Sequence, residues 1–221
     1  MSGTILALAL VLAAAPALGR APVLVQAPAR GTREDALERL AKGDPPARQQ
    51  AAAALGDLGA MADAPVLLRA LRDDDEGVRA AAETSLWEIW SRSGDPQIDA
   101  LFQIGVEQMT AGDAGGAIAT FTTIIQKKPD FAEGWNKRAT VYYLVGDYEK
   151  SLEDCAEVVK RNPQHWGVLA GYGQIYLALD KPELALEYFQ RALQVNPNLR
   201  SVEEAVVELK RLIIEKRKGT I

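Results

Sequence analysis

Between positions 32 and 93, hydrophobic and small residues recur with a period of 31 residues. Over 48–58 and 78–90, alanines and leucines fall at the i, i+3, i+4 spacing of an amphipathic helix. Asp44 and Asp75 precede these segments and can accept hydrogen bonds from the unpaired amides of a helix N-terminus. The pattern therefore predicts two helix pairs. The matching positions are Leu37 with Leu68, Leu40 with Leu71, Asp44 with Asp75, Arg48 with Arg79, Ala51 with Ala82, and Leu55 with Leu86.

A second period, of 34 residues, follows in the next part of the chain. Pro129, Pro163 and Pro197 close three consecutive units, since a proline cannot continue a helix. Each unit is predicted to hold two amphipathic helices, which must stack on neighbours because one pair cannot bury its apolar face alone. The units are 98–131, 132–165 and 166–199, and the other repeating columns are Gly105, Ala139 and Gly173; Ala117, Ser151 and Ala185; Phe121, Cys155 and Phe189; and Gly112, Gly146 and Asp180.

Residues 200–218 are predicted to form a helix that caps this array. Ser201 and Glu204 have the spacing of a capping box. Three basic residues, 216–218, favour the negative end of the helix dipole. One apolar stripe is expected to face the preceding helices, and it consists of Val202, Ala205, Val206, Leu209, Leu212 and Ile213.

Both patterns resemble known repeat families. The acidic turn at 73–76 followed by Val-Arg-Ala-Ala-Ala at 78–82 resembles the short HEAT-like repeat of the phycobilisome-lyase type, a module found in many contexts, so lyase activity is not implied. The 34-residue unit, with its small residues, aromatic knob and closing proline, resembles the tetratricopeptide repeat (TPR). Trp135 and Tyr142 add the aromatic positions of that family. The resemblance implies an all-α, right-handed solenoid of two HEAT-like pairs (32–93), three TPRs and a capping helix, with a role in protein recognition.

The N-terminal segment differs in kind from the repeats. Residues 1–19 carry no charged side chain, and 5–15 is an unbroken apolar run that is too short to span a bilayer comfortably. Small residues follow it, as at a signal-peptidase site, so a signal peptide over 1–19 is expected and the protein would be periplasmic or secreted. The alternatives are an uncleaved membrane anchor continuing past Arg20, or an apolar tail on a cytosolic protein. Residues 20–31, with Pro22 and Pro28, are predicted to form an extended linker.

Composition excludes several classes of function. The chain has 221 residues, 48% of them hydrophobic, and a net charge of −5, which disfavours binding to nucleic acid. One histidine and one cysteine leave almost nothing for a zinc site or a histidine-dependent triad. We therefore expect no catalytic residues, metal, cofactor or small-molecule substrate. Cys155 shares a column with two phenylalanines and is predicted to be buried and unreactive, whereas His165 is predicted to lie in a surface turn.

Trp87 and Trp90 widen the apolar face of the helix predicted over 78–90 to about half of its circumference, at about 100° per residue. A face of this width fits a helix with neighbours on two sides. We therefore predict that the two tryptophans join the HEAT-like block to the first TPR. The alternative is an exposed aromatic patch that binds a ligand.

The TPR resemblance implies a concave groove lined by the first helix of each unit. Co-chaperone TPRs hold a peptide's C-terminal carboxylate there with a clamp of cations and asparagine. The matching positions here hold only one cation, Lys137, beside Phe102, Val106, Gly167 and Gly171, so carboxylate binding is not expected. The alternative to an open groove is one partly covered by the chain's own ends. The residues predicted to line the groove are Phe102, Val106, Met109, Asn136, Thr140, Tyr143, Ala170, Gln174 and Leu177.

These observations predict a non-enzymatic protein-interaction scaffold that holds an extended segment or a helix of a protein partner in the TPR groove. Three alternatives remain. The protein could be an accessory subunit of an envelope enzyme or assembly complex, a membrane-anchored adaptor if the N-terminus is not cleaved, or a self-assembling solenoid.

Overall fold

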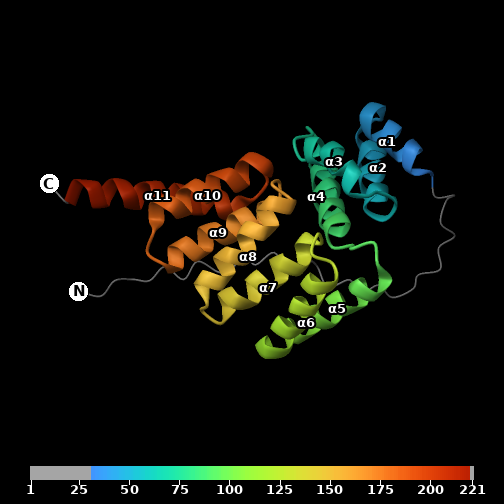
Figure 1. Cartoon of the computed structure of the whole chain (residues 1–221). Coiled ribbons are helices and arrows are strands. Elements are labelled where there is room, and N and C mark those ends of the chain that lie inside the picture. Colours follow the sequence, from blue (N-terminus) through green and yellow to red (C-terminus); the bar gives the residue numbers. More distant parts are fainter. Residues whose placement is uncertain (1–30, 220–221) are drawn as a thin grey trace.

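The computed structural model describes residues 31–219, and within them it is helical throughout (Figure 1). The all-α fold predicted from the two periods is thus confirmed. The HEAT-like part holds α1 (Arg33–Lys42), α2 (Pro45–Leu58), a 3₁₀ turn (Met61–Asp63), α3 (Ala64–Ala70) and α4 (Glu76–Trp90). The second part holds α5 (Pro96–Thr110), α6 (Ala114–Lys127), α7 (Ala132–Leu144), α8 (Tyr148–Arg161), α9 (Trp166–Ala178), α10 (Pro182–Val195) and α11 (Arg200–Gly219).

The predicted aspartate caps begin the two central helices of the first block. The Asp44 side chain accepts a hydrogen bond from the amide of Ala47 at 2.9 Å, and Asp75 accepts one from Val78 at 3.0 Å. Helices α2 and α4 pack closely, and Ser85 Oγ donates to the carbonyl of Ala52 at 2.8 Å between them. The small side chains of α2 permit this approach.

Helices α5 to α10 form three successive hairpins, in which α5 packs on α6, α7 on α8 and α9 on α10. A Cβ at Gly105 would lie 2.7 Å from the ring of Phe121, and one at Gly173 would collide with Phe189. The small residue is therefore required because the aromatic side chain of the second helix fills the space. Each of the three turns also contains one residue with positive φ: Gly112 (80°), Gly146 (82°) and Asp180 (51°).

The first block rests on the third hairpin and not on α5 (Figure 1). Trp90 packs on Trp166, with ring centroids 4.4 Å apart. The predicted seam with the first TPR is therefore wrong. Periodicity fixes which face of α4 is apolar, but it does not specify which later repeat supplies the complementary surface. That surface includes Gly167, where the absence of a side chain leaves room for the ring of Trp87.

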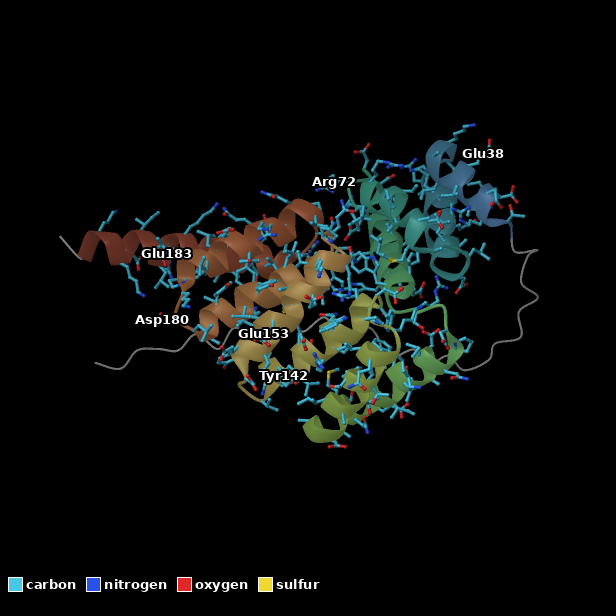
Figure 2. The ribbon with its side chains drawn as sticks, in the orientation of Figure 1. Glu38, Arg72, Tyr142, Glu153, Asp180 and Glu183 are labelled. Carbon is cyan, nitrogen blue, oxygen red and sulfur yellow. The ribbon has the colours of Figure 1, made fainter. Side chains whose placement is uncertain are left out.

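A second set of contacts holds the two blocks together at the end of α10. The guanidinium of Arg72 donates to the carbonyls of Gln194 and Val195, the latter at 3.2 Å (Figure 2). The amide of Asn198 donates to the carbonyl of Leu71 at 2.8 Å. These bonds fix the end of α3 against the turn between α10 and α11.

Helix α11 packs on α10 through most of the predicted apolar stripe. Leu212 is the exception, because 43% of its surface is exposed. Leu212 lies at the edge of the stripe, whereas Ile213, one residue further along α11, is only 6% exposed. Helix α11 has 20 residues and α10 only 14, and its last turns extend past α10 (Figure 1). None of the helices described is both long and apolar enough to cross a membrane. The predicted signal peptide or anchor (1–19) and most of the linker (20–31) lie outside the described residues.

Candidate functional site

A cavity of about 320 Å³ lies on the face shared by the first helices of the three hairpins. It brings together six of the nine predicted groove residues. Met109 comes from α5, Asn136, Thr140 and Tyr143 come from α7, and Ala170 and Gln174 come from α9. Lys137, Gly167 and Gly171 also line it.

Phe102, Val106 and Leu177 do not line this cavity. Phe102 is only 8% exposed and packs edge-on against Phe121, with ring centroids 6.0 Å apart, so its placement in an open groove is corrected. The reason is visible in the spacing, because Phe102 precedes Gly105 by three residues and therefore shares the face that meets Phe121. Val106 packs against the same apolar cluster, and Leu177 packs against the cluster that links α10 and α11 to the first block.

One wall of the cavity comes from outside the TPR hairpins. Glu83 and Trp87 of α4 line it, as do Leu199, directly before α11, and Val202 in the first turn of α11. The cavity is therefore partly enclosed by other segments of the same chain. This arrangement is close to the predicted alternative, in which the chain's own ends partly cover the groove. The width of the apolar face of α4 is the sequence signal for this wall. Nothing in the spacing indicates that it would reach the groove.

His165 and Glu133 form a fully buried pair beside this cavity, which corrects the prediction of a surface histidine. His165 Nδ1 accepts a hydrogen bond from the amide of Val168 at 3.1 Å, so the proton is assigned to Nε2, which faces the carboxylate of Glu133. The sequence did contain a signal: one period before His165 stands Phe131, which is also buried. A residue in an apolar column is expected to be buried.

Several groups stabilise the buried carboxylate of Glu133. Burial acts to raise its pKa, but the imidazole of His165, the ammonium of Lys137 and the amide of Asn136 outweigh burial and lower that pKa to about 2. The Glu133 carboxylate lies 3.0 Å from Asn136 Nδ2 and 4.0 Å from Lys137 Nζ. Glu133 is therefore held ionised at neutral pH.

Two other titratable side chains of the lining, Cys155 and Tyr143, are uncharged at neutral pH. The thiol of Cys155 is buried, as predicted, and burial raises its pKa to about 12, which makes it a poor nucleophile. Tyr143 is half-buried, with its ring centroid 5.7 Å from that of Tyr148. Burial and then the neighbouring Tyr148 raise the pKa of Tyr143, so its hydroxyl stays neutral. In the part of the chain that the structure describes, no three His, Cys, Asp or Glu side chains are grouped to hold a metal ion.

Comparison with known proteins agrees with both repeat patterns. The HEAT repeats family model matches residues 10–103, and tetratricopeptide repeat models match 132–165 and 173–199. A TPR repeat-containing protein of Rhizobium etli is 32% identical over 139 residues, which are 63% of this chain and 67% of that protein. The chain belongs to the TPR repeat-containing proteins. It is also 32% identical over 83 residues to anaphase-promoting complex subunit 7 of Dictyostelium discoideum, but spans only 14% of that protein.

Solved structures share the TPR fold with this member of the family. The first TPR of Spaghetti (RPAP3), bound to the HSP90 peptide SRMEEVD, superposes with a TM-score of 0.52 at 21% identity, covering 54% of this chain and 96% of that one. The Sgt2 TPR domain from Aspergillus fumigatus gives a TM-score of 0.53 at 21% identity, covering 57% and 85%. At this identity the likeness establishes the fold alone.

Proposed function

We propose that this TPR protein is a non-enzymatic interaction module that holds an extended segment of a partner protein in the cavity between α5, α7 and α9. The observation that supports this most is the convergence of Met109, Asn136, Tyr143 and Gln174 on one cavity of about 320 Å³. That volume lies in the range of small binding pockets, and it accommodates one or two side chains of a peptide.

The chemistry of the lining suits peptide recognition. Asn136, Thr140 and Gln174 offer donors and acceptors for a backbone, while Met109 and Tyr143 offer apolar surface. Related TPR folds supply a precedent, since the Spaghetti domain was solved with a bound HSP90 peptide. A partly enclosed, partly apolar cavity on the same helical scaffold gives this chain a comparable site.

We further propose export to a bacterial periplasm through the segment 1–19, with a membrane-anchored adaptor as the form taken if that segment is retained. An accessory role in an envelope enzyme or assembly complex is compatible with the same groove. That role predicts stoichiometric co-purification with one catalyst.

The experiment selects binders from a phage-displayed library of random twelve-residue peptides and measures their Kd by fluorescence polarisation. Tyr143→Ala is expected to weaken binding about thirtyfold, about 2 kcal/mol, as for a central aromatic anchor. Tyr142→Ala is the matched control, because Tyr142 (labelled in Figure 2) directly precedes Tyr143 on α7. Tyr142 does not line the cavity. Glu187→Ala, an exposed position on α10, is a second control. Equal losses in Tyr143→Ala and Tyr142→Ala would place binding elsewhere.

A further inference from the structure

Two charged side chains line the cavity within the described residues, Glu83 from α4 and Lys137 from α7. The charge of Lys137 is engaged inside the protein. Its side chain is only 11% exposed, and its Nζ lies 4.0 Å from an oxygen of the buried Glu133 carboxylate. Lys137 therefore lies against the buried carboxylate of Glu133, and its charge contributes little to a ligand in the groove.

Glu83 is in a different situation. It stands one helical turn before Trp87 on the wall contributed by α4, and it is half-buried. Among residues 31–219 it makes no hydrogen bond or ion pair. A partly desolvated carboxylate without a partner is unfavourable, and a cation brought by a ligand would relieve this. The cavity wall therefore carries an unbalanced negative charge next to apolar surface.

We propose that the groove selects a partner segment in which a lysine or arginine lies beside an apolar side chain, the apolar group entering the cavity near Tyr143 and the cation pairing with Glu83. This rests on the proposed function and specifies the class of partner. Arginine is favoured over lysine because its guanidinium can donate two parallel hydrogen bonds to one carboxylate. An acidic peptide such as the SRMEEVD bound by the Spaghetti domain is disfavoured, because its glutamates would meet a like charge.

The selectivity would come from the HEAT-like block. Met109, Tyr143 and Gln174 supply the cavity from the TPR hairpins, whereas the unpaired charge comes from α4, which is held in place by the packing of Trp87 and Trp90 on the start of α9. The first block thus determines the charge of the peptide, and the TPR hairpins provide its apolar contact.

The test uses four synthetic peptides built on one apolar core taken from the selection above, acetylated and amidated so that no terminal charge contributes. They differ at one flanking position, which is arginine, lysine, glutamine or glutamate. Wild-type protein is expected to bind the arginine peptide about fivefold more tightly than the glutamine peptide, and the glutamate peptide most weakly. The difference should shrink between 50 mM and 500 mM salt, because added ions screen a partly exposed pair.

Variants of Glu83 assign the effect to one side chain. Glu83→Gln should bind the four peptides with nearly equal affinity, and Glu83→Lys should prefer the glutamate peptide. Glu153→Lys changes the net charge by the same amount at an exposed position on α8 and should preserve the wild-type order (Figure 2). Circular dichroism melts establish that the variants are folded, and Glu83→Gln suffices should the lysine variant not fold.

The outcomes separate the two proposals. If binding depends on Tyr143 but Glu83→Gln keeps the wild-type order of the peptides, the charge preference is overturned and the peptide-binding function stands. The charge preference is also overturned if Glu83→Lys and Glu153→Lys change the order equally. If no peptide binds in a Tyr143-dependent way, the proposed function fails, and the charge preference fails with it.

Discussion

The imidazole of His165 stacks on the indole of Trp90, with ring centroids 4.8 Å apart and the planes 24° from parallel. The pair joins two repeat blocks that differ in period. Trp90 is 4% exposed and His165 is fully buried, so the contact excludes water from the junction.

Trp90→Ala is expected to lower the free energy of unfolding by about 3–5 kcal/mol, because it leaves a large cavity between the two blocks. It should also weaken the coupling between blocks, so that a single unfolding transition separates into two. Guanidinium titrations followed by circular dichroism measure both effects. Trp135→Ala is the control, since Trp135 is half-buried on α7 away from the junction and should cost less. An unchanged midpoint for Trp90→Ala would contradict the packing described above.

Gly167→Ala is expected to destabilise the protein by about 1–3 kcal/mol, because the new methyl group would lie 2.6 Å from Cη2 of Trp87. Gly171→Ala on the same helix meets nothing within 4 Å and should stabilise by about 0.5–1 kcal/mol, as alanine favours a helix. Thermal melts of both variants supply the comparison. In a Trp87→Ala background the penalty at Gly167 should fall, leaving only the contact of the new methyl group with Cε1 of His165 at 3.3 Å. An unchanged penalty there would point to a different cause.

Stability at low pH should depend on Glu133. Its pKa is lowered from the ordinary 4.5 to about 2, so its ionised form stabilises the native state above pH 4.5. That contribution is lost as the pH falls from 4.5 towards 2. The free energy of unfolding, measured by urea titration at steps of half a pH unit, should therefore fall more steeply for wild type than for Glu133→Gln across this window. Glutamine keeps an acceptor for His165 and does not titrate. Parallel curves would show that Glu133 is not held ionised by its neighbours.

Processing of the N-terminus is the fourth prediction. The uncharged apolar run ending in small residues predicts a mature chain that begins near Leu18 or Arg20. N-terminal sequencing of the protein recovered from an exporting bacterium tests this directly. Recovery of an intact Met1 in a membrane fraction would instead favour the anchor.

The sequence predicts the helices and their pairing well because both depend on local spacing. Asp44 and Asp75 cap the helices they precede, and Gly105 faces the ring of Phe121 one helix later. The junction is different in kind, because Trp90 and His165 are 75 positions apart and no period relates them. The contribution of Glu83 to the groove could not be predicted for the same reason, because it depends on how α4 packs against the third hairpin.

The predictions that Phe102 lines the groove and that His165 lies in a surface turn are both wrong, although the sequence contained signals for burial at both positions. Phe102 stands three residues before a glycine that faces an aromatic ring, and His165 occupies the column of Phe131. In both cases the apolar periodicity was a better guide to burial than residue type or alignment on the prolines. Their actual positions show that the face of α5 carrying Ile98, Phe102 and Gly105 is core, and that a polar side chain can fill an apolar column when a carboxylate is buried beside it.

The bond between Asn198 and Leu71 spans 127 positions, which sets this chain apart from a solenoid whose repeats contact only their neighbours. Such long-range closure slows folding, because the entropy of ordering the intervening chain is lost before the contact forms. As the chain emerges from the ribosome, α1–α4 are complete long before the surface they dock on exists. Their tryptophans must therefore stay exposed until the third hairpin forms, and in that interval the nascent protein presents an aggregation-prone surface to chaperones.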